Sequence, residues 1–125
     1  MLTRDQILQA DDLPYEDVDV PEWGGAVRLR SLTGAERDAF ETSIVQGNDR
    51  NMRNIRARLV VLCIVDDEGN RVFKDNEAPA LGKKSAKALD TLFAVAQKLN
   101  GLSNDDVDDL AKNSPETTSD ELTSD

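Results

Sequence analysis

Hydrophobic and polar residues alternate along two short stretches near the N-terminal end of this chain. Residues 18–20 alternate valine with aspartate, and residues 27–30 alternate valine and leucine with arginine. This period of two is typical of strands with one solvent-exposed face. Gly24 and Gly25 lie between the two stretches and favour a turn that needs positive φ. The pattern therefore predicts a β-hairpin with Trp23 at its tip.

Apolar residues recur every three or four positions in several later segments, which indicates amphipathic helices. The predicted helices span about residues 34–46, 50–63, 86–99 and 103–112. Thr33 with Glu36 matches a capping box at the start of the first of them. A short helix capped by Thr3, with Ile7 as an apolar contact, is also expected before Pro14.

A polar run, DDEGN, separates Ile64-Val65 from residues 71–73 and predicts a second short hairpin. The run is a poor match to a calcium-binding loop, because it lacks the ligand spacing of an EF-hand. One helical turn is expected over residues 75–81.

These elements predict an α+β fold. We expect a small single domain in which two short β-hairpins pack with about three main α-helices, followed by an acidic C-terminal helix and a disordered tail. The predicted boundaries are 1–102 for the folded α+β domain, 103–112 for the acidic helix and 113–125 for the disordered acidic tail. The tail is rich in Ser, Thr, Asp and Glu, a composition that favours disorder.

Composition argues against an enzyme. The chain of 125 residues has no histidine and a single cysteine, Cys63. An intrachain disulfide, a Cys/His zinc site and a Ser-His or Cys-His catalytic pair are therefore excluded. Cys63 lies in the apolar run LVVLCIV and is interpreted as a core residue. We expect no catalytic residues, no metal and no cofactor.

Charge narrows the range of partners. The net charge is −10, and residues 103–125 hold eight acids and one lysine, which leaves −3 for residues 1–102. An acidic protein repels polyanions, so no nucleic-acid partner is expected. No apolar run reaches the roughly 18 residues of a membrane span, and the N-terminus lacks the apolar core of a signal peptide. We therefore expect a cytoplasmic protein with no membrane partner.

Candidate binding residues have structural alternatives. Trp23 is either a partner-binding anchor or a ring folded back onto the core, and we favour the core. Four arginines, Arg50, Arg53, Arg56 and Arg58, fall within nine residues and raise the hypothesis of a phosphate site. We favour a solvated face, or pairing with Glu36, Asp38 and Glu41 on the preceding helix. The candidates for partner binding are Trp23, Met52, Arg53 and Arg56.

Three stretches carry a resemblance to a known family: VPEWGGAVRLRSLTGAERDAFE, IRARLVVLCIVDDEGNRVF and ALGKKSAKALDTLFAVAQKLNGLSNDDVDDLAKN. Together they resemble the tail assembly chaperones of long-tailed, siphophage-type bacteriophages and prophages. The resemblance implies a protein that binds the tape measure protein, a long and largely helical chain. It also implies help with assembly of tail tube protein around that chain, in the host cytoplasm, and absence from the finished virion.

The resemblance further implies a longer form of the protein, made by a −1 ribosomal frameshift near the end of the gene. Ala111-Lys112-Asn113 can be encoded as the slippery sequence GCA AAA AAC, which makes the frameshift a testable hypothesis. The longer form and further copies of the chain are then expected as partners. Two alternatives are a small structural tail or head-tail component retained in the virion and, with less support, an acidic inhibitor that mimics DNA.

Overall fold

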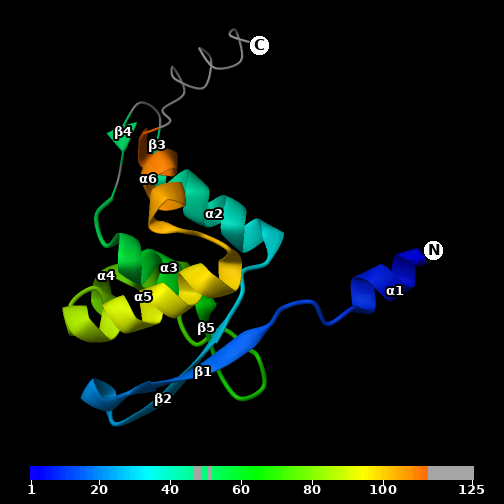
Figure 1. The fold of residues 1–125 in the computed structure, drawn as a ribbon, viewed down its shortest axis with the longest axis horizontal. Coiled ribbons are helices and arrows are strands. Elements are labelled where there is room, and N and C mark those ends of the chain that lie inside the picture. The colour runs from blue at the N-terminus through cyan, green and yellow to red at the C-terminus, as the bar shows by residue number, and fades with distance from the viewer. Residues whose placement is uncertain (47–48, 51, 113–125) are drawn as a thin grey trace, which may run out of the picture.

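The computed structural model describes residues 1–46, 49–50 and 52–112, and it has the predicted α+β architecture (Figure 1). A three-stranded antiparallel sheet lies against a layer of helices. In chain order the elements are α1 (Arg4–Gln9), β1 (Tyr15–Val20), η1 (Pro21–Trp23), β2 (Gly25–Arg30), α2 (Gly34–Ile44), β3 (Val45–Gln46), β4 (Asp49–Arg50), α3 (Ile55–Cys63), β5 (Ile64–Val65), η2 (Asp75–Glu77), α4 (Ala78–Leu81), α5 (Ala86–Asn100) and α6 (Asn104–Lys112).

The first predicted hairpin is confirmed. β1 and β2 pair antiparallel with Val18 opposite Val27 and Val20 opposite Gly25. The connection contains the short helix η1, and the left-handed residue that closes it is Gly24, with φ of 76°. Because alternate side chains point to one face, Val18 and Val20 are buried while Asp17 and Asp19 face solvent.

The predicted second turn is present, but its strand pairs in a way that the sequence did not indicate. β5 joins the first sheet in the order β1-β2-β5, with Leu29 opposite Ile64. The chain returning from the turn contributes only an isolated bridge between Val65 and Arg71. A two-residue strand gains little from its own hairpin, whereas the edge of β2 lies beside the core and offers it a longer partner.

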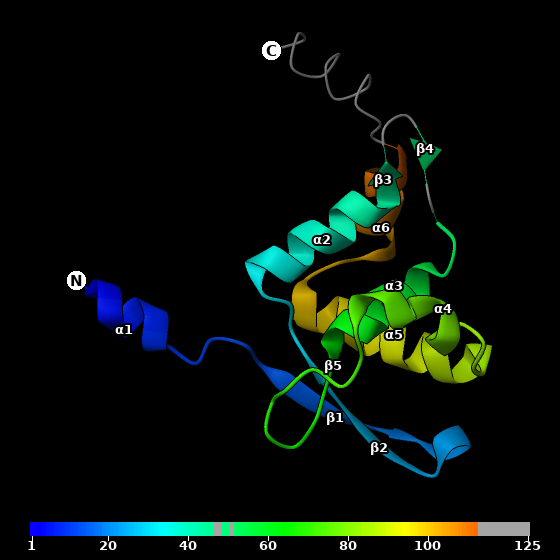
Figure 2. The same cartoon turned by 180° about the vertical axis from the view of Figure 1, so that it is seen from behind.

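α3 is the central helix of the domain. Six of its nine residues are buried, and it contacts α2, α4 and α5. Both views place it between α2 and α5 (Figure 2). The face of α5 toward the sheet contacts β1 and β2. The side chains most completely buried come from these elements: Phe40, Leu29, Ile44, Leu59, Leu92, Val20, Val60, Val61 and Cys63.

The predicted start of α3 near Arg50 is wrong. The helix begins at Ile55, because residues 49–50 pair with β3 as β4 and Asn54 adopts a left-handed conformation with φ of 56°. Met52 therefore lies before the helix and is 37% exposed.

The end of α5 follows its sequence signals. Ser85 caps its start, and Gly101 closes its end with φ of 64°. The backbone N–H of Leu102 donates to Gln97 across this end, and the Leu102 side chain is buried. This is the arrangement expected of a helix closed by a left-handed glycine.

The acidic helix α6 begins with a capping box. The Asp106 carboxylate accepts from the Ser103 N–H at 2.9 Å, and the Ser103 hydroxyl accepts from the Asp106 N–H at 3.0 Å. Val107 is buried, and the helix contacts α2. The predicted tail at 113–125 lies outside the described residues.

α1 lies apart from the rest of the domain in both views (Figures 1 and 2). Thr3 caps this helix, as the sequence predicts, and it also forms a reciprocal capping box with Gln6. The expected apolar contact at Ile7 is wrong, since this side chain is 56% exposed. None of the α1 residues is buried, so this six-residue helix has its capping box but little tertiary packing to stabilise it.

Candidate partner-binding surface

A largely apolar hollow of about 220 Å³ lies between the hairpin tip and α4. Trp23 from η1, Phe73 from the loop after β5, and Ala80, Leu81 and Lys84 form its walls. The ring of Trp23 is half-buried and packs against the core, as the favoured interpretation predicted. Its remaining exposed edge lines the hollow, so one side chain serves both the core and a surface that a partner can reach.

Two further hollows continue around α4. The second, of about 200 Å³, is lined by Met52, Arg56 and Lys84 among others, so it shares Lys84 with the first. The third, of about 500 Å³, is lined by Arg53 and Arg58. Asn54 lines both the second and the third hollow. The residues that line these three adjoining hollows are called the α4 surface below.

Asn54 is the junction of this surface. Its side chain lies against Gly82, where an added Cβ atom would be 2.5 Å from the Asn54 Oδ1. A side chain at position 82 would therefore displace the Asn54 amide, since the added Cβ atom would also lie 3.3 Å from the Ala78 carbonyl oxygen.

The α4 surface is basic although the chain is strongly acidic. Among the described residues that line it, the charged side chains are Arg53, Arg56, Arg58 and Lys84 against one acid, Asp75. The net charge of the whole chain is −10. A ligand at this surface therefore meets more cationic than anionic side chains among those that line it, although one of the cations, Arg56, is paired with Asp90 beside it.

The arginines of α3 differ from the predicted pairing. Arg56 is exposed, as the solvated-face alternative expects, and it pairs with Asp90 of α5 at 2.6 Å, not with an acid of α2. Arg58 donates to the backbone oxygen and the hydroxyl of Ser43 at 2.7 and 2.9 Å. Burial lowers the pKa of the Arg58 guanidinium. The side chain of Arg50 lies outside the described residues.

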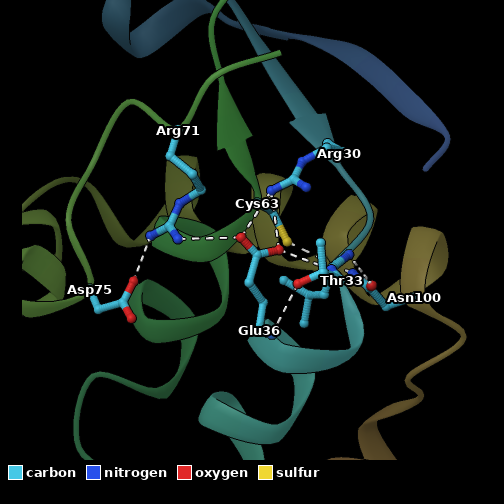
Figure 3. A network of polar contacts seen from close by, with 8 residues as sticks. Arg30, Thr33, Glu36, Cys63, Arg71, Asp75 and Asn100 are labelled. Carbon is cyan, nitrogen blue, oxygen red and sulfur yellow. Dashed lines mark hydrogen bonds and ion pairs between the residues drawn. The ribbon is translucent and has the colours of Figure 1, made fainter. Parts of the chain in front are cut away.

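Glu36 is instead the centre of a different network (Figure 3). Its carboxylate accepts from Arg30 at 3.0 Å and from Arg71 at 3.4 Å, and both arginines are largely covered. Arg71 also pairs with Asp75 at 2.8 Å. The network thus connects the end of β2 and the start of α2 with Asp75, which lines the third hollow. These ion pairs fix the position of that wall relative to the domain.

Cys63 is a core residue, as predicted. It is 0% exposed, and burial raises the pKa of its thiol to about 12. The Asn100 amide lies 3.8 Å from its sulfur. At neutral pH the thiol is therefore protonated and a poor nucleophile. Among the described residues no cluster of three or more metal-ligating side chains occurs, and no helix has the length and apolar character of a membrane span.

Comparison with known proteins identifies the family. The sequence profile of the family described as phage tail assembly chaperone matches residues 4–113. The chain belongs to this family. The chaperone is also similar to the solved structure of the bacteriophage HK97 tail assembly chaperone, with a TM-score of 0.56 and 21% identity. That match covers 80% of this chain and 95% of the other, and it shows a shared fold. No curated protein sequence matches the chaperone.

The four residues proposed from the sequence lie along one surface of the chaperone. Trp23 lines the first hollow, Met52 and Arg56 the second, and Arg53 the third. The sequence analysis did not single out Phe73 or Lys84, because both belong to short irregular segments without a recognisable pattern. Only the fold brings them beside Trp23.

Proposed function

We propose that this chaperone binds the tape measure protein, keeps it soluble and assists assembly of the tail tube around it. The match of the tail assembly chaperone family over residues 4–113 is the observation that carries the proposal. The chaperone acts by protein binding alone, without a cofactor or a chemical reaction.

The surface chemistry supports binding to a helical client. The hollow beside Trp23 and Phe73 offers apolar walls to a side chain from an amphipathic helix. The net charge of −10 keeps a complex with an apolar client dispersed, because like charges repel between complexes. The chaperone therefore combines an apolar contact surface with strong colloidal stability.

Co-expression tests client binding directly. The tape measure protein encoded in the same phage genome is produced with and without the full chaperone chain, and the soluble fraction is measured. We expect the tape measure to be soluble and to co-purify only when the chaperone is present. A tape measure that remains insoluble, or that is equally soluble alone, would contradict the proposal.

We also propose that this chain is the short member of a pair, the longer member arising by a −1 frameshift near Ala111-Lys112-Asn113. The native gene is expressed with its downstream DNA, and the products are examined by intact-mass and peptide analysis. A minor longer product that shares residues 1 to about 112 and then follows the −1 frame is expected. A gene without a slippery heptamer in its last codons would contradict the proposed frameshift.

The proposed site of action is the host cytoplasm, and the proposed fate is exclusion from the mature particle. Proteomic analysis of purified virions and of infected-cell lysate distinguishes this from a structural role. We expect the chaperone in the lysate and not in the virion. Stoichiometric recovery from virions would show a retained tail or head-tail component.

A further inference from the structure

We propose that the α4 surface is the client-binding groove and that it takes an acidic amphipathic helix. The inference rests on the proposed function and adds the place of contact and the chemistry of the client segment. Apolar side chains of the client helix fill the hollow beside Trp23, and its acidic side chains meet Lys84 at the edge of that hollow.

Apolar contact is concentrated at one end of the surface. Trp23, Phe73 and Leu81 belong to three different elements and form a hollow of about 220 Å³. Each of these side chains also packs in or against the core, so the hollow is present before a partner arrives. A preformed apolar hollow binds with less loss of conformational entropy than one that must be assembled.

The charge at the groove selects the client. Lys84 is exposed and lines the hollow, and its ammonium group forms no ion pair with a described residue. Lys83 and Lys87, its neighbours along the chain, are exposed as well. The complementary partner of such a lysine is a carboxylate. A basic helix would bring like charges together at this groove.

Charge favours a client helix over the other apolar helix at hand, α1 of a second copy. α1 carries exposed Ile7 and Leu8. Its one acid, Asp5, pairs with its one base, Arg4, at 3.1 Å, so α1 offers the lysine of the groove no net negative charge.

Binding at the groove can be followed by tryptophan fluorescence, because Trp23 is the single tryptophan of the chain. The full chain is titrated with two synthetic helical peptides of about 18 residues, both with leucines at i, i+3, i+4 and i+7 spacing. One peptide carries glutamate at its flanking positions, and the other carries lysine there. We expect the acidic peptide to shift the Trp23 emission to the blue and to bind at least about tenfold more tightly than the basic one. Raising the salt from about 0.05 to about 0.5 M should weaken this binding.

Two surface substitutions test the place of binding. Lys84→Glu reverses a charge in the groove, and Ala80→Glu places an acid on its exposed wall. Each should weaken the acidic peptide about tenfold or more. Lys98→Glu is the matched control, because Lys98 is an exposed lysine of α5 that does not line the hollows. It should bind the acidic peptide as the unmodified chain does, and all three variants should keep the melting temperature.

Several results would overturn the inference. Tighter binding of the basic peptide would show that the overall negative charge dominates. Equal effects of Lys84→Glu and Lys98→Glu would show that binding is not at the groove. A Trp23 emission that depends on protein concentration without peptide, and loses this dependence when residues 2–11 are deleted, would assign the groove to α1 of a second copy.

The tape measure itself separates this inference from the proposed function. If the unmodified chain and the Ala80→Glu, Lys84→Glu double variant both keep the tape measure soluble, the chaperone function stands and the groove assignment fails. If the unmodified chain fails to keep it soluble, the proposed function fails. If the tape measure loses solubility only with the double variant, the result supports both the proposed function and the groove assignment.

Discussion

The side-chain oxygen of Asn100 accepts a hydrogen bond of 2.7 Å from the backbone N–H of Leu32. The same amide donates to the Ala96 carbonyl at 2.8 Å. Leu32 is 8% exposed, and its N–H lies at the junction between β2 and α2. One side chain at the end of α5 thus satisfies a covered backbone group 68 positions earlier in the chain.

We expect Asn100→Ala to lower the free energy of unfolding by about 1–3 kcal/mol, because the Leu32 N–H loses its acceptor in a covered site. Urea unfolding followed by circular dichroism measures the change. Gln97→Ala is the control, since its amide bonds to Asn104 at the surface, and a change within about 0.5 kcal/mol is expected there. Equal losses of stability in the two variants would show that the loss does not arise from the covered N–H of Leu32.

Glu36→Ala should lower the free energy of unfolding more than Asn100→Ala does. The carboxylate pairs with Arg30 and Arg71 and also accepts from the Thr33 N–H in the capping box. Its loss leaves the largely covered Arg30 guanidinium without its acid, while Arg71 keeps Asp75, and we expect about 2–4 kcal/mol of destabilisation. Asp5→Ala breaks an ion pair whose side chains are about 80% exposed and should change stability by less than about 0.5 kcal/mol. Urea unfolding of both variants makes the comparison, and a small effect of Glu36→Ala would contradict the structural role of the network.

Cys63 predicts a stability that falls at high pH. Burial raises the pKa of its thiol from 9.0 to about 12. The contribution is complete below pH 9 and is lost as the pH rises toward 12, because the unfolded chain then ionises the thiol and the folded chain does not. The stability difference between the unmodified chain and Cys63→Ala should shrink by up to about 1.4 kcal/mol per pH unit above pH 9. Urea unfolding at pH 8, 9 and 10 measures it, and a constant difference would be inconsistent with a raised pKa.

Two glycines give a matched test of helix termini. Gly101 closes α5 at φ of 64°, a conformation that alanine adopts with strain. Gly101→Ala should therefore lower stability by about 1 kcal/mol, whereas Gly34→Ala, at the first position of α2 and without positive φ, should raise it by about 0.5 kcal/mol. An added Cβ meets no atom within 4 Å at either position, so backbone conformation alone separates them. Thermal unfolding of both variants reports the signs, and equal signs would refute the explanation.

The elements that the sequence predicted well carry their signals within a few neighbouring residues. The hairpin follows from its alternating valines and Gly24, and α5 follows from Ser85 and Gly101 at its two ends. These features act locally, so an amino-acid pattern is enough to reveal them.

Features that depend on distant contacts were missed or misplaced. The start of α3 moved to Ile55 because residues 49–50 pair with β3, and β5 joined β2 because that edge lies beside the core. The partner of Arg56 is on α5, a helix that sequence spacing did not relate to it. The α4 surface has the same origin, since Trp23 and Lys84 meet only in the folded chain.

The outer edge of β1 has a consequence for how copies of the chaperone meet. β1 pairs with β2 on one side, and no described strand pairs with its other side. Three of its six residues are acidic: Glu16, Asp17 and Asp19. Two such edges brought together would place carboxylates opposite carboxylates, so the sheet resists growing from one molecule into the next. Molecules of the chaperone at high concentration should thus resist joining into fibres through this edge.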